Sequence, residues 1–292
     1  MKYLKTKLTL FFLFYISALQ ANTSMDAMQC INFPLTYSEL NIPQTRANLN
    51  GKPIDFTVDL GMQNAFSLEE TLVNELYGTQ LQYENIIQSD LGGNINTIQK
   101  GILPTAVLNG QLFKNLSFTL YKPWGLWINA DAKEHPMPNN TLGRDLFLKN
   151  KGILYYSRNK RLLRWCNGDF NNIQDTASQI IWMPLIEDQD GIHITVFYKD
   201  RPLNLVFDSA ATVTLIRPIN RLSTAPQEAN TQSHHSGYID TLKIDHASIN
   251  TLIYQHEFPS DFQADGLIGD SFFQDVDIII DTINQKIGLV FL

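Results

Sequence analysis

The sequence predicts a mostly β protein built from two similar halves. Most segments are short, alternate apolar with polar residues, and are separated by Gly, Asn and Pro turns. Two patterns occur once in each half and in the same order: a strand that ends in an acid followed by a small residue, and later an apolar-Gly turn. Few segments have the periodicity of a helix. The best helix candidate is 68–77, with Glu69 and Glu70 in its first turn.

The N-terminus has the features of a signal peptide. Lys2, Lys5 and Lys7 precede an apolar stretch at 8–19 that is too short to span a bilayer comfortably, and Ala21 supplies a small residue for cleavage. No later stretch has the length of a transmembrane helix. We therefore expect a secreted or periplasmic protein with no stable membrane anchor, with an uncleaved anchor as the alternative.

Charge narrows the range of partners. The net charge of −7 becomes more negative once the three lysines of the signal segment are removed, and no basic run remains. An acidic exported chain of this kind is a poor candidate for binding nucleic acid or anionic membranes.

The first repeated pattern places an acid at the end of a strand. PIDFTVDLGMQNAFSL (Pro53–Leu68) and PLNLVFDSAATVTLI (Pro202–Ile216) have the same shape. In each segment the acid, Asp59 or Asp208, comes six residues after the proline.

The second repeated pattern centres on a glycine. TLGRDLF overlies LIGDSFF, and in both halves a short helix and two strands joined by a polar turn are expected to follow. The motif glycines are Gly143 and Gly269, and we expect Asp145 and Asp270 to cap the short helices.

These repeats divide the chain. We expect a signal peptide at 1–21, an N-terminal lobe at 30–166, a polar linker at 167–179 and a C-terminal lobe at 180–292. Cys30 and Cys166 lie at the two ends of the first lobe, and an oxidising compartment favours a disulfide between them over two free thiols.

The small residues after each acid suit two backbones that approach closely. If the halves pack so that Asp59 and Asp208 face each other, the two carboxylates share a proton and their pKa values separate. One can then activate a water molecule while the other protonates a substrate carbonyl, which requires no metal and no cofactor. His-Glu-x-x-His and Gly-x-Ser-x-Gly patterns and a phosphate-binding glycine loop are absent from the sequence.

These residues resemble the pepsin and retropepsin clan of aspartic proteases. Asp208-Ser209-Ala210-Ala211-Thr212 is similar to the family's Asp-Thr/Ser-Gly-Ala-Ser/Thr, and Asp59-Leu60-Gly61 is similar to Asp-Thr-Gly. DGLIGDSFF is close to the form found in bacterial retropepsin-like domains. The resemblance implies two β-barrel lobes related by a pseudo-twofold axis, with a cleft between them. It implies a catalytic pair, residues that support the catalytic loops, and a glycine beneath each loop: Asp59 and Asp208; Gly61, Ser209, Ala210 and Thr212; Gly143 and Gly269.

The chain departs from the family pattern at two positions. Leu60 replaces a hydroxyl residue whose side chain hydrogen-bonds across the lobe interface in the family, and leucine cannot make that bond. Ala210 replaces a glycine whose backbone lies near the carboxylates. The resemblance also implies a hairpin flap in each lobe, for which 89–94 and 234–238 are the candidates.

The prediction is an exported aspartic endopeptidase, monomeric, that hydrolyses an extended peptide or protein substrate with Asp59 and Asp208 as its dyad. One alternative is a catalytically inactive relative that binds a peptide or protein in the same cleft, which Leu60 and Ala210 favour. Another is an unrelated exported β domain that binds a small ligand or a sugar.

Overall fold

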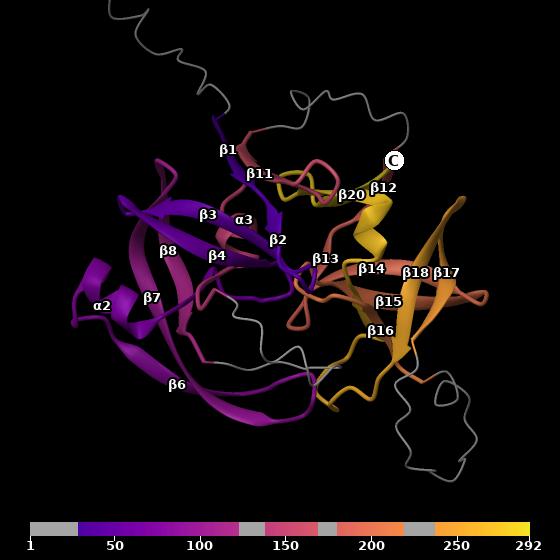
Figure 1. Cartoon of the computed structure of the whole chain (residues 1–292), viewed down its shortest axis with the longest axis horizontal. Helices are drawn as coiled ribbons and strands as arrows, with labels where there is room; N and C mark the ends of the chain where they lie inside the picture. Colours follow the sequence, from indigo (N-terminus) through magenta and orange to yellow (C-terminus); the bar gives the residue numbers. More distant parts are fainter. Residues whose placement is uncertain (1–28, 123–137, 169–179, 219–236) are drawn as a thin grey trace, which may run out of the picture.

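The computed structural model describes residues 29–122, 138–168, 180–218 and 237–292, and it is mostly β as predicted (Figure 1). The expected signal peptide lies outside the described residues, as do 169–179 of the expected linker and 234–236 of the second flap candidate.

An eight-stranded sheet comes from the first half of the chain. Its strands, in spatial order, are β2 (Thr36–Tyr37), β3 (Pro43–Leu49), β4 (Lys52–Asp59), β9 (Thr141–Gly143), β5 (Phe66–Leu68), β8 (Gln111–Leu120), β7 (Ile95–Leu108) and β6 (Tyr83–Ser89). β3 also pairs with β7, which gives the sheet a barrel-like curvature. The β7–β8 turn uses Asn109 at φ 47° and Gly110 at φ 86°, as a tight hairpin requires.

A seven-stranded sheet comes from the second half. Its strands are β13 (Ile186–Glu187), β14 (Ile192–Tyr198), β15 (Arg201–Phe207), β19 (Gly266–Ile268), β16 (Thr214–Ile216), β18 (Ala247–Gln255) and β17 (Tyr238–Ile244). An additional β14–β17 pairing matches the β3–β7 pairing of the first sheet. Strand for strand the order is that of the first sheet, which has β6 in addition. Equivalent segments therefore occupy equivalent places in the two sheets.

A six-stranded sheet joins the two halves. It runs β1 (Gln29–Pro34), β11 (Leu162–Asn167), β10 (Ile153–Ser157), β20 (Val276–Asp281), β21 (Lys286–Phe291) and β12 (Ile180–Pro184). β10 pairs antiparallel with β20, so the backbones of the halves are hydrogen-bonded to each other. Both strands are buried along their whole length, which explains their nearly continuous apolar sequence.

Helices are few among the described residues: α2 (Glu70–Tyr77), α3 (Asp145–Leu148) and the 3-10 turn η4 (Phe272–Gln274). α2 begins two residues later than 68–77 predicts, because Leu68 ends β5. In the described part of the chain, no helix is long and apolar enough to cross a membrane.

The capping roles expected for Asp145 and Asp270 are wrong. Neither α3 nor η4 has a side-chain cap. The carboxylate of Asp145 instead accepts a bond from Ser117 and pairs with Lys149 at 2.5 Å, while that of Asp270 pairs with Arg158. A nearby cation competes successfully for a buried carboxylate that would otherwise bind backbone N–H groups.

The hydrophobic core is continuous from one half to the other. Tyr156 of β10 packs edge-on against Phe207 and Phe273 of the second half, with ring centroids 6.0 and 5.6 Å away. All three side chains are fully buried. Phe207 directly precedes Asp208, so this cluster fixes the end of the strand that carries the second acid.

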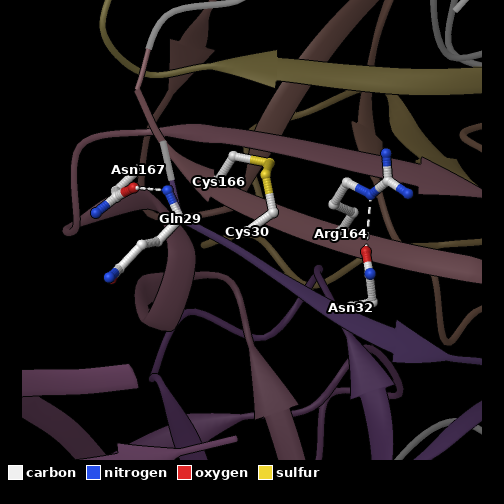
Figure 2. Close-up of a disulfide and its surroundings, with 6 residues drawn as sticks. All are labelled: Gln29, Cys30, Asn32, Arg164, Cys166 and Asn167. Carbon is white, nitrogen blue, oxygen red and sulfur yellow. Dashed lines mark hydrogen bonds between the residues drawn. A yellow bond between two sulfur atoms is a disulfide. The ribbon is translucent and has the colours of Figure 1, made fainter. Parts of the chain in front are cut away.

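A disulfide joins Cys30 to Cys166 across the β1–β11 ladder, where the two residues are direct partners (Figure 2). The Asn167 side chain accepts a bond from the Gln29 backbone N–H, and Arg164 donates to Asn32 on the same pair of strands. Because β1 is at the sheet edge and pairs only with β11, the disulfide fastens a strand held on one side.

We predict that replacing both cysteines, Cys30→Ser with Cys166→Ser, lowers the free energy of unfolding by about 2–4 kcal/mol, since the closed loop no longer restrains the unfolded chain. Urea unfolding of the double variant and the wild type measures this difference. An unchanged midpoint and slope would contradict it.

Candidate active site

The two acids stand at equivalent ends of equivalent strands. Asp59 is the last residue of β4, which pairs in parallel with β9, and Asp208 follows β15, which pairs in parallel with β19. Each strand end therefore points its acid toward the segment that contains the motif glycine of the same half.

The motif glycines lie directly beneath the acid loops. A Cβ on Gly143 would come within 2.0 Å of the Asn64 carbonyl oxygen, and one on Gly269 within 2.3 Å of the Val213 carbonyl oxygen. Real side chains do not tolerate such contacts, so both positions require glycine for close backbone approach rather than for an unusual φ.

Matching backbone bonds fix each loop above its glycine. The N–H of Arg144 donates to the Met62 carbonyl at 3.0 Å, and the N–H of Asp270 donates to the Ala211 carbonyl at 2.7 Å. The residue after each motif glycine thus holds the residue three positions after each acid. The local backbone geometry is repeated in the two halves.

The two acid loops meet. A Cβ on Gly61 would lie 2.8 Å from Cγ of Asp208 and 3.1 Å from each of its carboxylate oxygens. The backbone two residues after one acid is therefore in contact with the carboxyl group of the other. Only glycine allows this approach.

Backbone N–H groups hold both carboxylates. The Met62 N–H donates to Oδ1 of Asp59 at 2.9 Å, and the N–H groups of Ala210 and Ala211 donate to Oδ1 of Asp208 at 2.9 and 3.1 Å. Alanine at 210 therefore preserves the donor that orients Asp208.

Ser209 links the loops across the interface. Its hydroxyl accepts a bond from the Leu60 N–H at 2.9 Å and donates to the Val58 carbonyl at 3.0 Å. These two groups flank Asp59. Leu60 is fully buried, and its side chain offers no polar atom for a reciprocal bond to the second half.

The electrostatics couple the acids. Burial, and then the charge of Asp59, raises the pKa of Asp208 to about 7. Burial also raises the pKa of Asp59, opposed by its backbone hydrogen bonds and by the Arg144 cation. A pair of this kind retains a proton at pH values where an ordinary aspartate has lost it.

The tip of the β6–β7 hairpin touches the second half, as Figure 1 also shows. Ser89 donates to a carboxylate oxygen of Asp261 at 2.6 Å, and the His256 ring donates to the Leu91 carbonyl at 2.8 Å. The Leu91 side chain packs on a small apolar cluster of the second half: Val206, Leu215, Phe258, Ala264 and Leu267. This tip contains the first flap candidate, 89–94.

The buried hydroxyl near the Asp208 loop belongs to Thr214 and not to Thr212. Thr212, expected to support the catalytic loop, is exposed. The buried hydroxyl of this segment belongs to Thr214, which lies 3.2 Å from the Thr251 hydroxyl and accepts a bond from the Gly269 N–H at 3.4 Å.

Sequence reasoning also missed Arg144, whose signal was a cation directly after a motif glycine.

The described residues hold no group of three or more His, Cys, Asp or Glu side chains placed to bind a metal ion. The arrangement consists of two coupled carboxylates, backbone donors and one buried cation. It can hold a proton and orient a water molecule.

Comparison with known proteins gives a fold and no family. No family model matches the chain, and no curated protein matches it. Among solved structures, basic 7S globulin from soybean matches 90% of this chain and 94% of its own, with a TM-score of 0.50 and 9% sequence identity. At this identity the similarity concerns the fold alone.

We predict that Ser209→Ala lowers the free energy of unfolding by about 1–3 kcal/mol, because it leaves the buried Leu60 N–H and Val58 carbonyl without their partner. Urea unfolding measures the loss. The matched control is Thr212→Ala at the exposed hydroxyl of the same loop, for which we expect almost no change; equal effects of the two substitutions would refute the cross-interface role of Ser209.

The raised pKa of Asp208 has a consequence for stability. Its folded-state pKa of about 7 exceeds the ordinary value of 3.8, so the folded state binds the proton more tightly than the unfolded state. The stability that this proton contributes is complete below pH 3.8 and is lost as the pH rises through about 7. We expect Asp208→Asn to flatten the fall of unfolding free energy across this window in denaturation series; an unaltered slope would show that Asp208 has no raised pKa.

Proposed function

We propose that the protein is an exported aspartic endopeptidase in which Asp59 and Asp208 form the catalytic dyad. The observation that carries the proposal is the contact between the Gly61 backbone and the Asp208 carboxyl group. Two strand ends, far apart in the sequence, deliver their acids to one place, where each acid is held by backbone donors.

A two-lobed pepsin-like arrangement accompanies this proposal. Its support is the repeated strand order of the two sheets, together with the similarity to basic 7S globulin, a protein of pepsin-like fold. The lobes correspond to 30–166 and 180–292, and the six-stranded sheet forms their shared base.

The chemistry follows from one proton shared by two carboxyl groups. The ionised member removes a proton from a bound water molecule, which attacks the carbonyl carbon of the scissile peptide bond. The protonated member donates to the carbonyl oxygen, and the resulting tetrahedral species loses its amine after proton transfer to the nitrogen. The coupling of Asp59 to Asp208 keeps one proton available over a broad pH range.

The substrate is an extended peptide. The β6–β7 hairpin offers backbone groups with which such a peptide can pair as an added strand. Because the hairpin tip is bonded to Asp261 and His256, it has to lift from the second half before a peptide enters beneath it. The proposal includes export, supported by the N-terminal pattern and the disulfide, and a monomer, since one chain supplies both acids.

A second candidate is a relative without catalytic activity that binds a peptide or protein in the same place. Leu60 favours it, because this residue removes a cross-interface hydroxyl beside Asp59. The distinguishing property is turnover.

We predict that the mature protein cleaves a peptide library between about pH 3 and 8, and that Asp59→Asn and Asp208→Asn each reduce kcat/KM by roughly 10²–10⁴-fold, the size of a lost acid–base contribution. Mass spectrometry of the digests measures cleavage. Asp55→Asn, an exposed acid on the same strand as Asp59, is the matched control and is expected to retain activity.

The outcomes separate the candidates. Cleavage that survives in both dyad variants would refute the assignment of Asp59 and Asp208. A folded wild type that binds peptides without cleaving them at any pH would establish the binding protein instead.

A further inference from the structure

Within the part of the chain that the structure describes, Arg144 is the largest of the fully buried side chains, with 1% of its surface exposed. A guanidinium group stays charged at any relevant pH, and its burial is costly unless its donors are satisfied. The residue follows Gly143 directly, so it lies beneath the loop of Asp59. A buried cation next to two acids of raised pKa requires an explanation.

The guanidinium group divides its donors between the two halves. Nη1 donates to the Gly61 carbonyl at 2.7 Å, within the loop of Asp59. Nε donates to Glu187 at 3.0 Å and Nη2 donates to the Asp188 carbonyl at 3.0 Å, both in the second half at the end of β13. The planar group thus ties the Asp59 loop to the opposite sheet.

Arg144 binds the Asp59 loop at Gly61, the residue after Leu60. At Leu60 the loop has no side-chain bond to the second half. Ser209 reaches from the second half to Leu60 and Val58, but Leu60 returns no side-chain bond. Among the hydrogen bonds of the described residues, those of Ser209 and Arg144 link the Asp59 loop to the second half. The bond to Gly61 fixes the backbone segment that contacts the Asp208 carboxyl group.

The equivalent position in the second half has the opposite charge. Asp270 follows Gly269, is 2% exposed, and pairs with Arg158 in the turn between β10 and β11. Both positions therefore make ion pairs with the other half, but only Arg144 contributes a cation to the dyad. Its charge lowers the pKa values of both Asp59 and Asp208 against the larger effect of burial.

We propose that Arg144 is a positioning residue that holds the Asp59 loop against the second half, in place of the cross-interface hydroxyl that Leu60 does not supply. This inference rests on the proposed function for its catalytic consequence. The contacts and the electrostatic effect on the acids are independent of turnover.

The other charges around Arg144 are accounted for. Glu187 offsets its charge through the ion pair at Nε, and Asp188, whose carbonyl Arg144 binds, is bonded through Oδ1 to His193 at 2.7 Å. Asp59 and Asp208 face it from the acid loops. Within the described residues, Arg144 is the cation whose charge lowers the pKa values of both acids, so its removal raises them.

The first test replaces the side chain. We expect Arg144→Met to lower kcat by about 10²-fold with little change in KM, the cost of a small misplacement of a catalytic group. We also expect its pH–rate profile to move to higher pH. Arg144→Lys keeps the charge but loses the planar fork, so it should lower kcat without moving the profile.

The second test is rescue. Leu60→Thr supplies the missing hydroxyl, so in the Arg144→Met background it should recover about tenfold in kcat, a part of the loss attributed to positioning. The pH profile should stay displaced, because threonine restores no charge. A purely structural role predicts neither the displacement nor the rescue, and either absence would overturn the proposal.

Arg158→Met is the matched control, since it removes the equivalent ion pair, Arg158 with Asp270, which also joins the two halves. We expect it to lower the melting temperature without displacing the pH profile. If Arg144→Met does not fold, Arg144→Lys carries the kinetic test. Carbon-13 NMR titration of the aspartate carboxyls in the wild type and in Arg158→Met then tests whether Arg158, the arginine of the equivalent ion pair, acts on the dyad. Unequal dyad pKa values in the two proteins would overturn the assignment of this electrostatic role to Arg144 alone.

The same NMR titration separates the two proposals. If the wild type cleaves nothing, the proposed function fails, but higher dyad pKa values in Arg144→Met than in the wild type would still support the role of Arg144. If the wild type is active and Arg144→Met retains its kcat and its dyad pKa values, the inference fails and the proposed function stands.

Discussion

The arrangement of the site depends on the hydroxyl of Ser209. It bonds to the backbone on both sides of Asp59, although it belongs to a loop 149 residues away from Leu60 in the chain. Ser209, the residue after Asp208, therefore fixes the end of β4, which carries Asp59. The contact between Gly61 and Asp208, the coupling of the pKa values of Asp59 and Asp208, and the common core around Phe207 are all consistent with loops held at this separation.

Bringing two carboxyl groups together in this way opposes folding. Burial disfavours their ionised forms, and each disfavours the ionisation of the other. The rest of the molecule offsets this cost through features distant from the acids: a core continuous between the halves, a six-stranded sheet to which both contribute, and a disulfide at its edge. Destabilising groups at a site that are supported by a stable framework are typical of functional centres.

The sequence predicts the parts of this structure that depend on local pattern. The alternating strands and the two acids at strand ends follow from residue type and spacing, and the resemblance to the pepsin and retropepsin clan implies the glycines beneath the acid loops. The contacts that complete the site do not. Arg144 meets Gly61 and Glu187 across 83 and 43 residues, and no local pattern specifies these partners. Likewise, Thr212 precedes β16 and is exposed while Thr214 lies within β16 and is buried, so the start of a three-residue strand decides which hydroxyl supports the loop.

The repeated backbone carries different side chains, and this difference has a physical basis. In a symmetric pair of identical chains, the residue after each motif glycine would be the same on both sides. Two arginines would place two cations beneath the acids and stabilise their ionised forms, which opposes the retention of a shared proton. Two aspartates would leave the acids without a cation beneath either loop. A single chain with Arg144 on one side and Asp270 on the other avoids both situations. Arg144 fixes the Asp59 loop and lowers the pKa values of both acids, while Asp270 forms an ion pair with Arg158.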